Sequence, residues 1–300
     1  MVMPIKIANV TKYYGHSKTP AVHNLSLAIQ PGEVYGLLGA NGAGKTTTIR
    51  MILDFIRPSS GTIQLFGKDN LQGGASLRAR VGYLAGDVVL PKDVTAREFL
   101  TYLSKLSGKV DHVYMQHLTS RFSAQLDKKM NQLSKGNRQK IGIVQAFMHQ
   151  PDVLILDEPT SGLDPLMQEQ FYQVVNEVRE RGAAVLLSSH SFEEVDRMCD
   201  RIGIVRKGML VYEGSATGII ATQKPRWRIT LKHTKDTAKL AVSPALTVID
   251  TGKATLTVEP ADTIEKALAE ISHYAIVSMT TSQHGLEDEF LQFYDEETQS

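Results

Sequence analysis

The 300-residue sequence is short of cysteine and of long apolar runs. Its single cysteine, Cys199, excludes an intramolecular disulfide, fits a reducing cytosol and is expected to be a small buried residue. No stretch approaches the roughly 18 apolar residues that a membrane-spanning helix needs. The first residues, MVMPIKIANVTKYYG, lack the apolar core and cleavage site of a secretory signal. Any role at a membrane is therefore expected to depend on a partner.

An excess of charge of one sign is also missing. Lys and Arg number 33 and Asp and Glu number 32, which leaves a net charge of +1. A chain this close to neutral has no general attraction to nucleic acid or to anionic lipid. Neither an internal repeat nor a low-complexity segment interrupts the sequence, and its length suits one large domain plus a small one.

The order of the apolar segments indicates the fold class. Short apolar runs alternate with amphipathic stretches, which is typical of a parallel α/β sheet. Central strands covered on both faces are predicted at Val34–Leu38, Val153–Leu156 and Ala184–Ser188. Between Asp87 and Gln150 the periodicity becomes helical, which predicts a helical subdomain inserted into the α/β core. Its helices are expected at Val94–Leu106, Asp111–Leu126 and Lys135–Met148.

The sequence changes character after about Ala221. A small α+β domain is predicted over residues 223–300, following a first domain over residues 1–222. Its strands are expected at Arg226–Lys232, Leu246–Asp250, Lys253–Val258 and Tyr274–Thr280, and its helices at Thr263–Ile271 and Leu286–Tyr294. Two roles stay open for this domain: an accessory packing or dimerisation element, or a regulator of the first domain's activity.

A glycine-rich loop lies between a predicted strand and a predicted helix. Residues 39–46, GANGAGKT, match the pattern G-x-x-x-x-G-K-[ST], and Thr47 follows. Glycines let backbone amides turn toward phosphate oxygens, and the start of the helix adds its partial positive charge. Lys45 would reach the terminal phosphates, and the Thr46 hydroxyl would bind Mg²⁺. The predicted phosphate-binding residues are Gly39, Asn41, Gly42, Ala43, Gly44, Lys45, Thr46 and Thr47.

Two carboxylates close the apolar strand VLIL, roughly 110 residues after this loop. Adjacent buried carboxylates are costly unless they bind a cation or a polar partner. Asp157 is therefore predicted to hold Mg²⁺, and Glu158 to act as the general base that activates water.

Four segments in this order resemble ATP-binding-cassette (ABC) ATPases. They are the phosphate loop, LSKGNRQ at residues 133–139, VLILDEPTSGLDP at 153–165 and SSH at 188–190, and the resemblance spans about residues 5–221. It implies a P-loop NTPase cassette that binds ATP and Mg²⁺. In that family two cassettes pair head to tail, with each ATP held between one phosphate loop and the partner's signature segment.

The resemblance also implies roles for five further residues. Ser134 and Gly136 would contact the γ-phosphate of ATP bound to the other protomer, and Asp164 would lie in the loop that crosses the interface. His190 would sense the γ-phosphate beside the catalytic Glu158 and Lys45. Tyr14 would stack on adenine; Tyr13 is one residue out of register.

This sequence departs from the family pattern at two places. Gly86 occupies the position of a glutamine that links Mg²⁺ to the membrane partner, so either Asp87 substitutes for it or the contact is lost. In the signature, Lys135 replaces a glycine and Asn137 replaces a glutamine. These departures, and the ending LEDEFLQFY, resemble the subfamily that serves ABC-2-type exporters.

The resulting hypothesis is an ATPase subunit of an ABC-2-type exporter. It implies a homodimer of cassettes, separate transmembrane permease subunits, no nucleic acid, and a peripheral position on the cytoplasmic face of the cell membrane. One alternative is a cassette ATPase that acts on ribosomes or DNA, but such proteins usually carry two cassettes or long coiled coils. Another is a cassette that binds ATP without turnover, against which the intact Glu158 and His190 argue.

Overall fold

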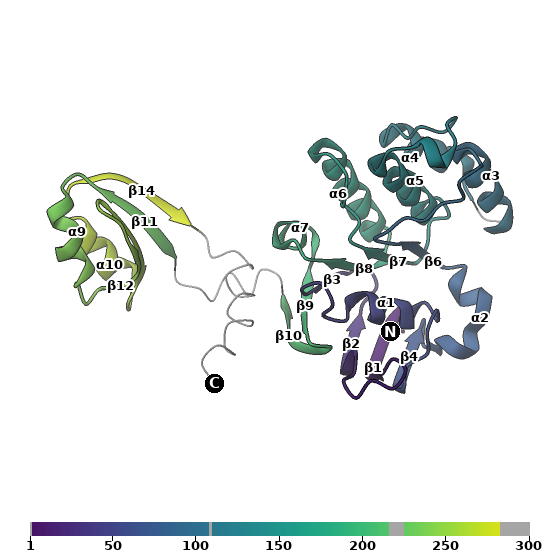
Figure 1. Ribbon diagram of the computed structural model, residues 1–300, viewed down its shortest axis with the longest axis horizontal. Helices are drawn as coiled ribbons and strands as arrows, with labels where there is room; N and C mark the ends of the chain where they lie inside the picture. The colour runs from purple at the N-terminus through teal and green to yellow at the C-terminus, as the bar shows by residue number, and fades with distance from the viewer. Residues whose placement is uncertain (1, 108–109, 216–224, 283–300) are drawn as a thin grey trace. The chain divides into compact units, whose positions relative to one another are not determined.

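The computed structural model describes residues 2–107, 110–215 and 225–282. The chain forms two compact units, residues 1–216 and 217–300 (Figure 1). The boundary predicted between residues 222 and 223 lies outside the described residues, as does the helix predicted at Leu286–Tyr294.

A six-stranded sheet forms the centre of the first unit. Its order is β10-β9-β3-β8-β7-β6, with parallel pairing throughout except for the β9–β10 hairpin. The three predicted central strands are confirmed, and every residue of each is buried, as expected for strands covered on both faces. The strands are β3 (Val34–Leu38), β6 (Val81–Leu84), β7 (Val153–Asp157), β8 (Ala184–Ser189), β9 (Arg201–Arg206) and β10 (Met209–Ser215).

A smaller sheet lies on the other side of the first helix. The antiparallel strands β1 (Ile5–Lys12), β2 (Val22–Ile29), β4 (Ser60–Leu65) and β5 (Lys68–Asp69) follow the order β2-β1-β4-β5. Ile5, Leu27 and Ile49 share one buried cluster with Ile155 and Leu186 of the large sheet. Helix α1 (Lys45–Ile52) is therefore packed between the two sheets, which fixes the loop that precedes it (Figure 1).

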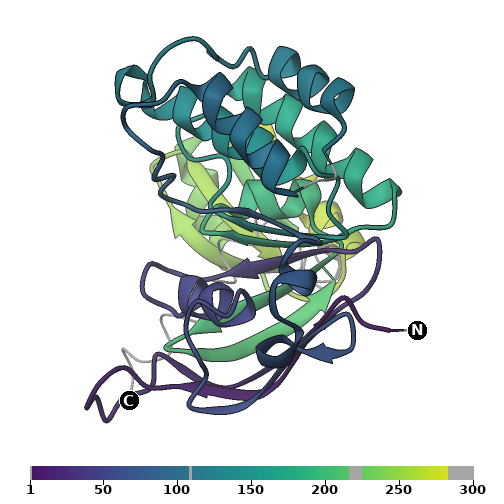
Figure 2. The ribbon, with the colours of Figure 1, turned by 90° about the vertical axis from the view of Figure 1, so that its right-hand side faces the viewer.

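Helices between β6 and β7 form the predicted helical subdomain (Figure 2). They are α3 (Ala96–Ser107), α4 (His112–Arg121), the short 3₁₀ helix Met130–Gln132 and α5 (Lys135–Phe147). The expectation that α4 reaches Leu126 is wrong: Ser123 adopts a left-handed φ of 49°, which ends the helix. Three further helices of the cassette were not predicted, namely α2 (Asn70–Arg78), α6 (Pro165–Glu180) and α7 (Phe192–Met198).

The second unit alternates strands and helices in the order β-α-β-β-α-β. Its antiparallel sheet has the order β12-β13-β11-β14, the split βαβ arrangement of ferredoxin-like domains. Trp227, Ile229 and Val258 of the sheet pack with Leu240 and Ile271 of the two helices. The elements are β11 (Arg226–Leu231), α9 (Thr234–Ala241), β12 (Leu246–Thr251), β13 (Thr255–Pro260), α10 (Ile264–Ile271) and β14 (Ile276–Ser282).

Across residues 2–107, 110–215 and 225–282, no helix combines the length and apolarity that a membrane crossing requires.

Candidate functional site

The glycine loop turns tightly between β3 and α1. Gly42 and Gly44 have φ values of 83° and 114°, a region that favours glycine. A Cβ at Gly39 would lie 2.5 Å from the Val205 carbonyl oxygen, so a side chain has no room there. The loop and the first turn of α1 line a cavity of about 140 Å³ with Glu158, and its loop residues include Ala40, Asn41, Gly42, Gly44, Lys45, Thr46 and Thr47. Ala43, also predicted to bind phosphate, is 5% exposed and belongs to the core.

The Lys45 ammonium lies inside this loop. It donates hydrogen bonds to the carbonyl oxygens of Gly39 at 2.5 Å and Ala40 at 3.3 Å, and lies 3.7 Å from Glu158 Oε1. Burial lowers the pKa of Lys45, whereas the carboxylates of Glu158 and Asp157 oppose that shift. A buried cation whose hydrogen bonds to carbonyl oxygens can be replaced by bonds to an anion is suited to bind that anion.

Asp157 ends strand β7 and binds two hydroxyl groups. The Thr46 hydroxyl donates to Asp157 Oδ2 at 3.1 Å, and the Ser188 hydroxyl donates to Asp157 Oδ1. Asp157 faces Ser188 because the two residues are register partners in the parallel pair β7–β8. A buried carboxylate beside a threonine hydroxyl provides oxygen donors of the kind that Mg²⁺ prefers, so the residues fit the predicted metal.

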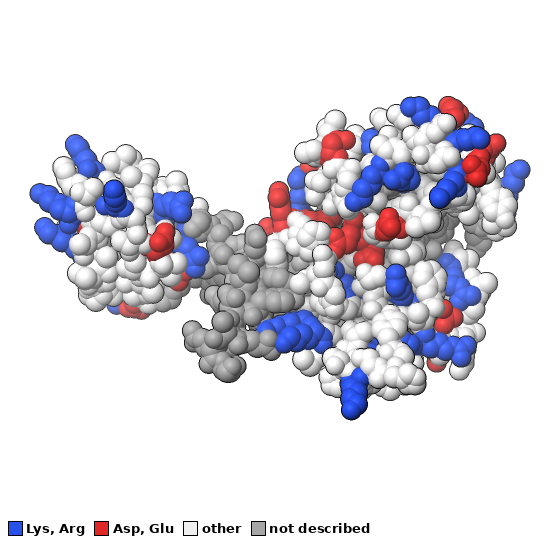
Figure 3. Space-filling model, viewed as in Figure 1, with Lys and Arg blue, Asp and Glu red and all other residues white. Residues whose placement is uncertain are grey.

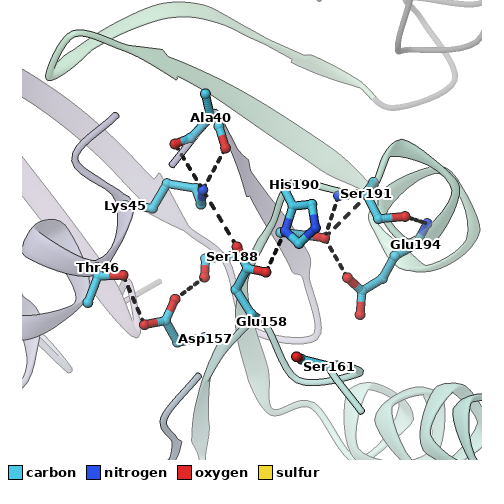
Figure 4. A network of polar contacts seen from close by, with 12 residues as sticks. Ala40, Lys45, Thr46, Asp157, Glu158, Ser161, Ser188, His190, Ser191 and Glu194 are labelled. Atoms are coloured by element: carbon cyan, nitrogen blue, oxygen red, sulfur yellow. Dashed lines mark hydrogen bonds and ion pairs between the residues drawn. The ribbon is translucent and has the colours of Figure 1, made fainter. Parts of the chain in front are cut away.

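Glu158 lies between the lysine and the histidine. Its left-handed backbone (φ 50°) turns the chain sharply at the end of β7, and its amide donates to the Ser188 carbonyl oxygen at 3.0 Å. One carboxylate oxygen faces Lys45, and the other lies 2.5 Å from His190 Nδ1 (Figure 4). The structure therefore brings together Lys45, Asp157, Glu158 and His190, residues from three separate segments of the sequence.

The predicted signature residues lie in a different environment. Ser134 caps helix α5 and accepts a hydrogen bond from the Asn137 amide at 3.2 Å. Asp164 caps helix α6 and accepts from the Met167 amide at 3.0 Å. A Cβ at Gly136 would lie 2.7 Å from a carbonyl oxygen of the loop before α6, so the two segments pack closely. Within the described residues, no hydrogen bond joins Ser134 or Asp164 to the phosphate loop.

Tyr14 lies beside the phosphate loop. Its hydroxyl is 3.4 Å from Thr47 Oγ1, and 44% of the residue is exposed. The Lys12 ammonium lies 5.5 Å from its ring centroid. Tyr13 is also exposed, at 39%, but its amide is bonded to the Ser59 hydroxyl on the edge of β4. An exposed ring beside the loop leaves a face on which a planar base can stack.

Gly86 lies directly against the end of β7. A Cβ at this position would be 3.2 Å from the Asp157 carbonyl oxygen and 3.6 Å from Glu158 Cβ. The backbone thus places residue 86 beside the two carboxylates, where a longer side chain would reach the site. Asp87 is exposed, and its role as a substitute stays a prediction.

Two contacts of the site were not anticipated from the sequence. Ser188 holds Asp157, and Lys135 donates to the Ser161 hydroxyl at 3.1 Å, which links the signature segment to the loop before α6. The sequence does contain a signal for the contact of Ser188 with Asp157, because SSH ends a strand parallel to VLILD. Predicting that contact would also have required the register between the two strands.

This chain is similar to known ATP-binding proteins. The family model described as ABC transporter matches residues 22–161. The Nod factor export ATP-binding protein I of Burkholderia lata is 35% identical over 74% of this chain and 74% of its own length. The ABC transporter ATP-binding protein NatA of Bacillus subtilis is 36% identical over 68% of this chain and 85% of its own. The bacitracin transport ATP-binding protein BcrA of Bacillus licheniformis is 36% identical, covering 70% and 69%.

Solved structures give the same result for the fold. An ATP-binding subunit of an ABC transporter superposes with a TM-score of 0.67 at 28% identity, over 74% of this chain and 92% of that one. The cbiO1 protein of Clostridium perfringens, part of the ABC transporter complex cbiONQ, has a TM-score of 0.62 at 25% identity and the same coverage. The expected α/β P-loop cassette is confirmed.

Proposed function

This chain belongs to the ABC transporter ATP-binding cassette family, and from that premise we propose that it binds and hydrolyses ATP to power an ABC-2-type exporter. The observation that carries the proposal is the contact of Glu158 with both Lys45 and His190 at the end of strand β7. These three side chains surround the place where a terminal phosphate would lie on the glycine loop. Catalysis of phosphoryl transfer rests on such positioning and on charge stabilisation.

Each side chain of the site would have its own role in hydrolysis. Lys45 would exchange its carbonyl contacts for oxygens of the β- and γ-phosphates. Glu158 would accept a proton from the attacking water, and His190, held through Nδ1, would offer Nε2 toward the γ-phosphate. Thr46 and Asp157 would hold Mg²⁺, which when bound neutralises charge on the phosphates.

The metal site fits this arrangement. The described residues contain no group of three or more His, Cys, Asp or Glu side chains placed to hold a metal ion. Mg²⁺ in such a site is commonly bound by one or two protein oxygens together with substrate phosphates. The Thr46 and Asp157 oxygens, which lie 3.1 Å apart, would be these protein ligands of Mg²⁺.

The second half of each site would come from another copy of the chain. Ser134 and Gly136 lie at the start of helix α5, where a hydroxyl, backbone amides and the helix dipole suit an anion. With Asp164 they would close over the ATP of a partner, which makes the active form a homodimer. Closure on ATP and reopening after hydrolysis would drive the conformational change.

Transport itself would require membrane-spanning partners on separate chains. The three relatives described above are ATP-binding proteins named for Nod factor export, for bacitracin transport and as an ABC transporter component. By similarity, this chain would act at the cytoplasmic face of the membrane, and its helical subdomain would receive the permease. Affinity purification from native membranes is expected to recover a multi-span membrane protein; recovery of ribosomes or DNA instead would contradict the proposal.

Hydrolysis is tested with the variant Glu158→Gln. Loss of the general base is expected to lower kcat by roughly 100-fold while ATP binding remains. The variant should then accumulate an ATP-dependent dimer in size-exclusion chromatography. The exposed Glu193→Gln serves as the control and should hydrolyse ATP at the native rate. A Glu158→Gln rate equal to that of the native protein would contradict the assignment of the base.

A further inference from the structure

A second buried carboxylate lies close to the site and has no role in the mechanism above. Glu194, in helix α7, is 4% exposed, and its Oε1 has no hydrogen-bond partner among the described residues. Burial raises the pKa of this carboxyl, and hydrogen bonds from Ser189 and Thr160 oppose the shift. An apolar side chain would fill the same space without this desolvation cost. The contacts of Glu194 indicate why a carboxyl group is present.

On one side, Glu194 holds the segment that carries His190. The Ser189 hydroxyl donates to Glu194 Oε2 at 2.5 Å, and the Ser191 amide donates to the same Ser189 oxygen at 2.9 Å. Ser191 also caps helix α7, its hydroxyl accepting from the Glu194 amide at 3.4 Å. Both neighbours of His190 are therefore attached to the residue at position 194, which limits the directions that the imidazole can take.

On its other side, this segment meets the catalytic carboxylate. His190 Nδ1 lies 2.5 Å from a carboxylate oxygen of Glu158. A chain of contacts therefore runs from Glu194 through Ser189 and His190 to Glu158. Figure 4 shows Glu194 on the far side of His190 from Lys45.

The residues of this chain of contacts, Glu194, Ser189, His190 and Glu158, line one cavity of about 460 Å³. The cavity lies between the loop after β7, the end of β8 and helices α6 and α7. Acidic side chains gather on the face of the cassette around these elements (Figure 3). Because the cavity leaves one side of these residues unpacked, van der Waals contact alone does not fix them, and the hydrogen bond of Ser189 to Glu194 restrains them further.

We propose that Glu194 is a positioning residue, which holds His190 against Glu158 by binding the hydroxyl of the neighbouring Ser189. The proposal deepens the hydrolytic function proposed above and rests on it. Glu194 does not touch the nucleotide, so its loss misplaces the base and the histidine without removing a contact to ATP. Such a defect lowers kcat and leaves the KM for ATP nearly unchanged.

The kinetic test compares three variants by ATPase assay. Glu194→Met, of similar volume, is expected to lower kcat about tenfold with less than about a twofold change in KM. Glu194→Gln keeps an acceptor for the Ser189 hydroxyl and should recover most of that loss. Glu193→Met, an exposed neighbour in the same helix, is the control and should have the native kcat. A raised KM with native kcat, or equal losses for Gln and Met, would overturn the proposal.

A double-mutant cycle separates positioning from a general loss of stability. If Glu194 acts through Ser189, Glu194→Met should cost little more in a Ser189→Ala protein than Ser189→Ala costs alone. If Glu194→Met lowers kcat by the same factor in the native and the Ser189→Ala proteins, the two residues act independently, and the proposal is contradicted.

An NMR measurement keeps the proposal testable without turnover. The ring signals of His190, assigned with His190→Ala, should move in Glu194→Met toward their positions in Glu158→Gln, because both changes release the imidazole. Unmoved signals in a folded Glu194→Met protein would overturn the proposal. A native protein that hydrolyses no ATP but shows the shift would instead refute the proposed function and leave the positioning role standing.

Discussion

The phosphate-loop region and the signature region are built differently in this chain. In the phosphate-loop region, Lys45 contacts Glu158, Thr46 contacts Asp157, and His190 contacts Glu158. In the signature region, Ser134 and Asp164 instead cap the helices that they begin. Under the proposed function, the first region is the hydrolytic half of a site, and the second would complete the site of another copy.

The energetics of the two regions differ in the same way. Lys45 and Asp157 are about 95% buried, so their charges need the partners they have. Ser134 and Asp164 are exposed, and a helix N-cap of this kind contributes about 1 kcal/mol to stability. Under the proposed function, the start of α5 would face an anion held by another molecule.

Among the variants that test this difference between the two regions, Lys45→Ala is expected to lower turnover most. Removal of the buried cation leaves Glu158 without its counter-charge and the phosphates without a fixed ligand. Turnover is expected to fall by at least about 100-fold, measured as phosphate release. Lys68→Ala, an exposed lysine of the small sheet, is the control. Unchanged turnover in Lys45→Ala would break the assignment of the loop.

A smaller effect is expected for Ser134→Glu in the signature region. A carboxylate at the start of α5 would face the γ-phosphate held by the other protomer, and such juxtaposition of like charges costs several kcal/mol. Turnover should fall roughly 50-fold, whereas ATP binding to the monomer, measured by calorimetry, should be retained. Ser134→Ala separates the loss of the cap from the added charge. Loss of monomer binding in Ser134→Glu would contradict the division into two halves.

The smallest effect is expected for Tyr14→Ala at the edge of the phosphate-loop region. Loss of base stacking removes about 1–3 kcal/mol in comparable sites, so the KM for ATP should rise about tenfold with little change in kcat. Tyr14→Phe keeps the ring, loses only the contact with Thr47, and should resemble the native protein. If Phe and Ala at this position raise KM equally, the ring does not stack on adenine.

The sequence was sufficient to predict the features that depend on residues close together along the chain. The buried strands follow from unbroken apolar runs such as Val34–Leu38, and the glycine loop follows from its local pattern. The contact of Asp157 with Ser188 was out of reach because it depends on which strands are neighbours and on their register. No sequence pattern distinguishes Glu194, and only tertiary packing shows that it is buried.

Helix prediction failed where polar residues weaken the periodicity. The sequence TKDTAKLA forms helix α9, although it carries only two residues of the second unit's core, Leu240 and the partly buried Ala241. Helix α4 ends at Arg121 because Phe122 and Ser123 leave the helical conformation, which the amphipathic pattern through Leu126 does not reveal. In both segments tertiary packing, which the sequence pattern does not record, decides the outcome.

Mixing two inactive proteins tests most directly the claim that each site is shared between copies. Lys45→Ala keeps a native signature region, and Ser134→Glu keeps a native phosphate-loop region, so a mixed dimer contains one complete site. Each protein alone should be nearly inactive, and an equimolar mixture should recover up to about a quarter of the native turnover, since about half of the dimers are mixed and each has one working site. A mixture no more active than the sum of its two components would contradict the shared site.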